Sequence, residues 1–148
     1  MPPPPHAWIG AGVSWASGAQ SLGGQPWGAG LNFSWVTQTK SKGDVNYVGI
    51  DGGMNSLIRP ALYGAWHAIL NLSRLGEPAD HMAHVVGPIC ETGDTLGYNR
   101  RLVRPSEGDV LLIATAGAYG RSMSSHYNLR APAGEQILPA KDSESLPD

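Results

Sequence analysis

No charged side chain occurs between Met1 and Trp35 of this 148-residue chain, and the whole sequence holds one cysteine, Cys90. A single cysteine excludes an internal disulfide framework and is typical of a reducing compartment. No apolar run approaches the roughly 18 residues that a membrane-spanning helix needs. The N-terminus has neither the basic start nor the compact apolar run of a signal peptide. These absences predict a cytoplasmic protein.

Clusters of basic residues are also missing, which bears on the expected partners. The net charge is -2 and no Lys- or Arg-rich run is present, so we do not expect a nucleic acid partner. His81 and His84 have H-x-x-H spacing, but on a strand this spacing places them on opposite faces. Because no third ligand accompanies them, we predict no metal site.

The composition changes near residue 35. Glycine, serine and four of the five tryptophans fill residues 1–35, which show neither a helical nor a strand period. After Trp35 the sequence becomes charged and alternating. The break indicates a linker or domain edge, or else sequence outside the fold that comes from a wrong start site or a shifted reading frame. Residues 139–148 are predicted to form a disordered tail.

Residues 36–138 are expected to form one mostly β domain, a sandwich or barrel with one short helix. Residues 36–40 and 45–51, joined by a turn that contains Gly43, have the pattern of a β-hairpin. Residues 100–109 resemble a turn region. Further strands are expected at residues 81–88, 110–117, 118–130 and 136–138.

The expected helix begins near Pro60, which is suited to the first helical turn. On such a helix Leu62, Trp66 and Ile69 would share one face. Arg59 precedes Pro60 in an apolar surround, where a guanidinium needs an anion to justify burial. That anion is either a carboxylate of the protein or a carboxylate of a ligand.

A short loop bounded by glycine and proline, GPICETGDTLG at residues 87–97, carries the thiol of Cys90 and the carboxylate of Glu91. A thiol in such a loop is suited to be a nucleophile, a proton donor or a metal ligand, and the alternative is buried filler. In an extended segment Glu91 points away from Cys90 and can reach a cationic group. The alternative for Glu91 is a solvated loop acid.

Two tyrosines are further candidates. Tyr63 lies four residues after Arg59 and would be on the same side of a helix. Tyr119 lies in the sequence AGAYG, where the small neighbours allow a ligand or another backbone to approach closely. The alternative for Tyr119 is a packed side chain with a bonded hydroxyl.

Three segments in this order, DGGMNSLIRPALYGAWH, VVGPICETGD and AGAYGRSMSSHYNLR, resemble the diaminopimelate decarboxylases. These belong to the pyridoxal-phosphate-dependent ornithine, diaminopimelate and arginine decarboxylases. The ornithine and arginine enzymes usually carry Asp after the loop cysteine, so Glu91 favours diaminopimelate. The resemblance implies that residues 36–138 are a C-terminal β-sandwich or Greek-key barrel domain.

The resemblance also implies a role for each candidate. Cys90 would donate a proton to the substrate after CO2 leaves, in the active site of the partner subunit of a homodimer. Glu91 would bind the distal ammonium of meso-diaminopimelate, and Arg59 its distal carboxylate. Tyr63 would be a second substrate contact. Tyr119 would contact both the substrate and the pyridoxal phosphate, in the reaction that makes L-lysine and CO2.

The family's N-terminal β/α barrel, with its Schiff-base lysine and phosphate site, has no counterpart in this sequence. The lysines present are Lys40, Lys42 and Lys141, and none lies in a barrel context. The sequence therefore predicts a C-terminal fragment that is inactive alone and pairs with a barrel domain. The alternatives are a non-catalytic β module for dimerisation or binding, a fragment that acts on ornithine or arginine, and an unstable product of a broken reading frame.

Overall fold

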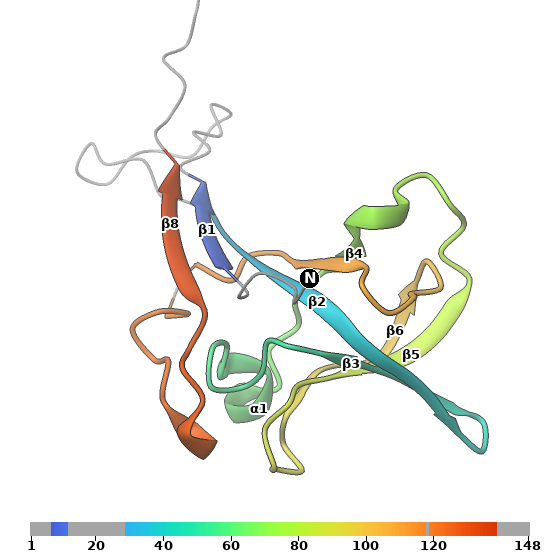
Figure 1. Ribbon diagram of the computed structural model, residues 1–148, viewed down its shortest axis with the longest axis horizontal. Coiled ribbons are helices and arrows are strands. Elements are labelled where there is room, and N and C mark those ends of the chain that lie inside the picture. The colour runs from blue at the N-terminus through green and yellow to red at the C-terminus, as the bar shows by residue number, and fades with distance from the viewer. Residues whose placement is uncertain (1–6, 12–28, 118, 139–148) are drawn as a thin grey trace, which may run out of the picture.

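The computed structural model describes residues 7–11, 29–117 and 119–138. They form a mostly β domain with a single short α-helix in the described part and two short 3-10 helices (η1, η2) (Figure 1). In chain order the elements are β1 (Ala7–Ala11), β2 (Ala29–Lys42), β3 (Val45–Ile50), α1 (Arg59–Tyr63), β4 (Ile69–Asn71), η1 (Leu72–Arg74), β5 (His81–Val86), β6 (Thr95–Leu102), β7 (Val110–Ile113), η2 (Tyr127–Leu129) and β8 (Gly134–Leu138).

The strands follow the order β4-β7-β2-β3-β5-β6, and β1 pairs with both β2 and β8. The two ends of this path approach each other, because Ile69 of β4 lies within 3.0 Å of the place where a Cβ on Gly97 of β6 would sit. The sheet is therefore nearly closed around a core whose fully buried members include Val48, Val85 and Leu111. The predicted mostly β, barrel-like fold with one short helix is confirmed.

Strand β2 links the two halves of the sheet. Its first part pairs with β1 and β7, and its second part pairs with β3 from Val36 onward, with an irregularity in register between Val36 and Gln38. Such irregularities bend a strand and let it pass from one sheet to another. Because β2 belongs to both halves of the sheet, the loops that follow β3, β5 and β7 are all part of one domain.

The start of β2 corrects the sequence analysis, which placed the first strand of the hairpin at Val36. The strand begins at Ala29 and runs without a break through Val36. Its early buried side chains are polar, because Asn32 and Ser34 lie inside and Ser34 donates a hydrogen bond to Asn32 at 2.9 Å. A buried polar face gives no apolar alternation, so the strand was not recognised. The origin of residues 1–35 stays open, and residues 139–148 lie outside the described residues.

Other elements agree in part with the sequence analysis. The hairpin of β2 and β3 is confirmed, with Gly43 at a φ of 59° in its turn. Strands β5, β7 and β8 and the helix at Pro60 are also confirmed. The strand predicted at residues 118–130 is wrong, because its described residues form turns and η2. Likewise, β6 occupies the first part of the predicted turn region and ends only at Leu102.

Helix α1 is too short to contain the predicted apolar face of Leu62, Trp66 and Ile69. It ends at Tyr63 because Gly64 adopts a left-handed φ of 65° and its N–H bonds to the carbonyls of Arg59 and Pro60. Trp66 therefore lies beyond the helix and is exposed, whereas Ile69 is buried in β4. Among the described residues, no helix is long and apolar enough to cross a membrane.

A close backbone crossing joins the start of β2 to the chain that follows β7. The N–H of Ala116 donates to the carbonyl of Gly30 at 2.8 Å, and a Cβ on Gly30 would lie 1.9 Å from the Cα of Gly117. No side chain fits between backbones at that distance, so glycine is required at position 30. The crossing directs the chain into the segment that begins at Tyr119.

We expect Gly30→Ala to lower the free energy of unfolding by about 2 kcal/mol, because the two backbones must separate. Urea denaturation followed by circular dichroism measures this difference. Gly93→Ala is the matched control, since a Cβ there meets nothing closer than 3.9 Å. A Gly30→Ala variant as stable as the parent protein would contradict the close crossing.

Candidate functional site

The loop between β5 and β6 presents a thiol and a carboxylate on adjacent residues. Cys90 and Glu91 are both exposed. The loop is closed by hydrogen bonds from the N–H of Glu91 to the carbonyl of Ile89 at 2.8 Å and from the N–H of Asp94 to the carbonyl of Glu91 at 3.0 Å. The alternative that Cys90 fills the core is therefore wrong, and the thiol is accessible to a ligand.

A buried carboxylate, that of Asp94, holds this loop in place. Its two oxygens accept hydrogen bonds from the N–H groups of Met54 and Ile89, each at 2.6 Å. The space around the carboxylate depends on glycines, because a Cβ on Gly53 or Gly87 would lie 2.9 or 2.4 Å from its oxygens. Asp94 thereby ties the loop that carries Cys90 to the segment before α1.

Burial raises the pKa of Asp94 above its ordinary value, and the amide bonds from Ile89 and Met54 and the charge of Arg130 oppose this increase. Both oxygens already accept hydrogen bonds inside the protein. Asp94 is therefore a structural anchor of the loop, and it leaves the exposed Cys90 and Glu91 as the groups that can meet a ligand.

We expect Asp94→Asn to destabilise the protein by about 2–4 kcal/mol, since the amide NH2 would face a backbone N–H that has lost its acceptor. Hydrogen exchange at the amides of Met54 and Ile89 should become faster. Asp44→Asn is the control, because Asp44 lies exposed in the hairpin turn. Unchanged exchange at both amides would show that Asp94 does not hold the loop.

Helix α1 lies beside this loop and carries two of the predicted site residues. A Cβ on Gly93 would lie 3.9 Å from the Cβ of Ala61, so the helix and the loop are neighbours (Figure 1). Arg59 begins the helix and is partly exposed, and Tyr63 ends it and is exposed. In the part of the chain that the structure describes, no carboxylate pairs with Arg59. Its guanidinium is therefore available to an external anion.

The segment after β7 forms the third side of the site. Tyr119 is exposed and has a left-handed φ of 62°. Buried Asn55 docks this segment, because its carbonyl accepts from the N–H of Ser125 at 2.8 Å and its side-chain amide donates to the carbonyl of Arg130 at 3.3 Å. The hydroxyl of Ser56 accepts from the N–H of Ala133 at 3.0 Å. The MNS stretch before α1 thus positions the Tyr119 segment.

Glu91 is held by a residue that the sequence analysis did not select. The hydroxyl of Tyr127 donates to one carboxylate oxygen of Glu91 at 3.1 Å, and the N–H of Thr92 donates to the other at 2.9 Å. The exposed carboxylate of Glu91 is thus oriented by two hydrogen bonds. The only sequence signal for Tyr127 was its position in the third motif, SMSSHYNLR.

The hydrogen bond to Glu91 raises the pKa of Tyr127, and the charges of Glu91 and Cys90 add to this effect. We expect Glu91→Gln to bring the pKa of Tyr127 down toward its ordinary value. The ultraviolet titration difference between each protein and its Tyr127→Phe variant measures this change. Glu107→Gln should leave the titration unchanged, and an equal titration in Glu91→Gln would contradict the contact.

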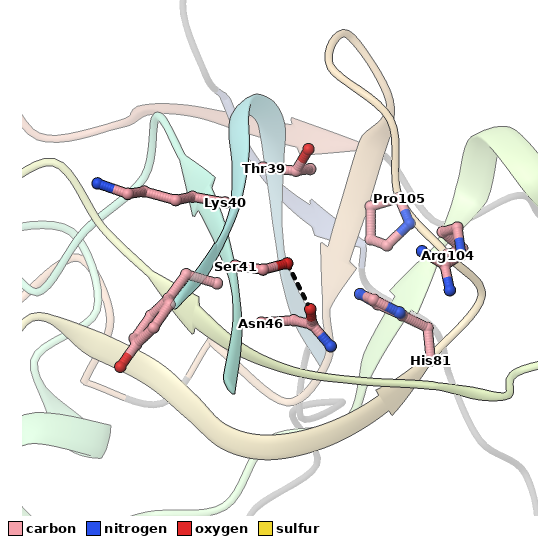
Figure 2. Close-up of a pocket in the computed structure, with 8 residues that line it drawn as sticks. Thr39, Lys40, Ser41, Asn46, His81, Arg104 and Pro105 are labelled. Atoms are coloured by element: carbon pink, nitrogen blue, oxygen red, sulfur yellow. Dashed lines mark hydrogen bonds between the residues drawn. The ribbon is translucent and has the colours of Figure 1, made fainter. Parts of the chain in front are cut away.

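The described lysines are not near these groups. Lys40 and Lys42 lie at the end of β2, in the hairpin that projects away from α1 (Figure 1). Lys40 lines a polar pocket of about 220 Å³ with Arg104 and His81, and Figure 2 shows its ammonium pointing away from both. The described residues therefore offer no lysine beside α1 and the loop of Cys90 that would bind pyridoxal phosphate covalently.

A metal ion is a poor fit to the same residues. Within the described ranges, no three His, Cys, Asp or Glu side chains are grouped so that they could hold one. His84 instead packs its ring edge-on against Tyr47 and Tyr98, and its Nδ1 accepts from the N–H of Asn99 at 2.9 Å. The candidate site thus consists of groups that are all at least partly exposed. They are the thiol of Cys90, the carboxylate of Glu91, the guanidinium of Arg59 and the phenols of Tyr63, Tyr119 and Tyr127.

Comparison with known proteins adds an independent observation. A family model described as "Pyridoxal-dependent decarboxylase, C-terminal sheet domain" matches residues 28–117. The diaminopimelate decarboxylase of Aquifex aeolicus is 43% identical over 110 residues, which are 74% of this chain and 26% of that protein. The enzyme of the same name from Neisseria meningitidis serogroup B is 46% identical over 110 residues, again 74% and 26%.

Solved structures agree with these relatives. The crystal structure of diaminopimelate decarboxylase from Helicobacter pylori in complex with L-lysine matches with a TM-score of 0.68 at 38% identity. The match covers 76% of this chain and 27% of that one. The chain thus spans about a quarter of the length of the proteins it matches.

Proposed function

Because this chain belongs to the pyridoxal-dependent decarboxylases, as their C-terminal sheet domain, we propose that it supplies the substrate-selecting and proton-donating half of a diaminopimelate decarboxylase site. The observation that carries the proposal is the pairing of exposed Cys90 with an oriented Glu91 on one anchored loop. Similarity to relatives named diaminopimelate decarboxylase supports it.

The charges of the site match the distal end of meso-diaminopimelate. That end carries an ammonium and a carboxylate, and the site offers the carboxylate of Glu91 and the guanidinium of Arg59. A planar guanidinium binds a carboxylate through two parallel hydrogen bonds. Ornithine has only an ammonium at its distal end, so it would leave Arg59 without an anion. This difference favours diaminopimelate as the substrate, whose distal head group becomes the α-ammonium and α-carboxylate of L-lysine.

The exposed thiol of Cys90 would give a proton to the substrate α-carbon after CO2 departs. Bound pyridoxal phosphate would draw electrons away from that carbon. Tyr119 would contact the cofactor and the substrate, and Tyr63 the substrate alone. The lysine that binds the cofactor, and its phosphate site, would belong to the barrel part of the enzyme.

The assembly is part of the same proposal. Cys90 would serve the active site of the partner subunit in a homodimer, and this chain alone would release no CO2 from meso-diaminopimelate. Its place would be lysine biosynthesis in the cytoplasm.

The test uses a fused enzyme, in which residues 28–138 of this chain replace the matching region of the Aquifex aeolicus relative. Cys90→Ala should lower kcat by about a hundredfold or more, because the proton donor is lost. Cofactor absorbance should not change. Glu91→Gln should mainly raise KM for meso-diaminopimelate, and Glu107→Gln serves as the control. An unchanged kcat in Cys90→Ala would refute the proton-donor role.

The substrate is tested by competition in the same enzyme. Meso-diaminopimelate should be decarboxylated in preference to ornithine and arginine, and Arg59→Gln should weaken this preference. Preferential decarboxylation of ornithine or arginine would contradict the assignment. A fused enzyme that binds cofactor but decarboxylates none of the three would favour a non-catalytic β module.

A further inference from the structure

Strand β6 contains a bulge that redirects one arginine. Val85 pairs with Gly97 and Ala83 pairs with Arg100, so two residues of β6 stand opposite His84 of β5. The second of these, Asn99, has a left-handed φ of 47°, and its N–H donates to Nδ1 of His84 at 2.9 Å. An extra residue in one strand shifts the alternation of the side chains that follow it. Arg100 is thereby turned to the same side of the strand as Gly97.

The side chain of Arg100 folds back across that glycine. A Cβ on Gly97 would lie 2.4 Å from Nε of Arg100, and the guanidinium carbon lies 4.7 Å from the centroid of the Trp66 ring. The enclosed Nε has no hydrogen-bond acceptor within the described residues, and burial lowers the pKa of Arg100. No carboxylate in this part of the chain pairs with the guanidinium. Only its terminal nitrogens remain available to a ligand.

These groups line a pocket of about 330 Å³ between the end of α1 and β6. Trp66 and Tyr98 are part of its wall, and Tyr63 stands next to Gly64, which also lines it. The side chains of these aromatic residues are more than 60% exposed. Tryptophan, tyrosine and arginine are the residues that most often dominate the binding energy of protein interfaces.

The neighbourhood of the pocket carries unmatched positive charge. His67 is buried, and its Nδ1 lies 3.0 Å from the carbonyl of Ala114. Burial lowers the pKa of His67, the bond to Ala114 opposes this, and the charges of Arg59 and Arg100 lower it further. The positive charges of both guanidinium groups therefore act on His67. A carboxylate placed in the pocket would complement the guanidinium of Arg100, which lines it.

We propose that this pocket, formed by Trp66, Tyr98 and Arg100, is the docking site for an acidic side chain flanked by apolar residues. The side chain would come from the part of the enzyme that corresponds to the remaining length, about three quarters, of the relatives. This occupant rests on the proposed function, since that function requires a barrel part. It is chosen because it brings both the carboxylate that Arg100 needs and apolar surface for the exposed rings.

The first experiment measures association between the full chain and the Aquifex aeolicus relative from which the matching C-terminal region is deleted. Sedimentation of the co-expressed proteins gives the dissociation constant. Arg100→Gln should weaken association by about tenfold or more. Arg104→Gln removes the same charge at a distant pocket and should have no effect. Equal association of the two variants would overturn the proposal.

A second measurement uses the full chain alone and does not depend on the folding of the truncated relative. The probes are N-acetyl-L-glutamate N-methylamide and its neutral glutamine counterpart, at fixed ionic strength. The fluorescence of Trp66 is obtained as the difference between the protein and its Trp66→Phe variant. This fluorescence should change when the glutamate probe is added and should not change with the glutamine probe. Arg100→Gln should abolish the change. Equal responses, or none, would overturn the carboxylate assignment. Stronger binding of free meso-diaminopimelate would indicate a small-molecule site and overturn the docking proposal.

The outcomes separate this inference from the proposed function. A complex that depends on Arg100 but releases no CO2 would support docking and contradict the decarboxylase assignment. Decarboxylation that is unaffected by Arg100→Gln, in a complex of unchanged affinity, would support the assignment and refute the docking site.

Discussion

The candidate site depends on one buried carboxylate, that of Asp94. Two backbone N–H groups that are far apart in sequence converge on it, one from Met54 and one from Ile89. A buried acceptor that is left without donors costs more free energy than an ordinary hydrogen bond contributes, so both segments are constrained together. The loop that carries Cys90 and the segment that leads into α1 are consequently placed as a unit.

Around this anchor, short buried polar residues take the place that large apolar residues have in most small domains. Asn55 and Ser56 bind the backbone of the Tyr119 segment, and Asn32 and Ser34 form the inner face of early β2. Buried polar groups must be paired, and a paired network fixes one arrangement of the backbone. The functional side chains can then remain exposed without losing their positions.

The sequence predicted those features that depend on local chemistry. The hairpin turn at Gly43, the helix at Pro60 and the loop with Cys90 each follow from neighbouring residues. Features set by long-range contacts were missed. Early β2 has a polar buried face, Tyr127 meets Glu91 only because Asn55 docks its segment, and the bulge at Asn99 depends on pairing with His84. The roles of Cys90, Glu91, Arg59, Tyr63 and Tyr119 stay predictions that this geometry permits.

The most direct test of the central claim is a crystal structure of the fused enzyme with bound L-lysine. The account predicts that the Cys90 sulfur faces the ε-carbon of the lysine, which is the carbon that lost CO2, and that the Glu91 carboxylate lies within hydrogen-bonding distance of the α-ammonium. It also predicts that Tyr127 still donates to Glu91. Lysine bound with the loop of Cys90 turned away from it, or with the α-ammonium held by another acid, would contradict the account.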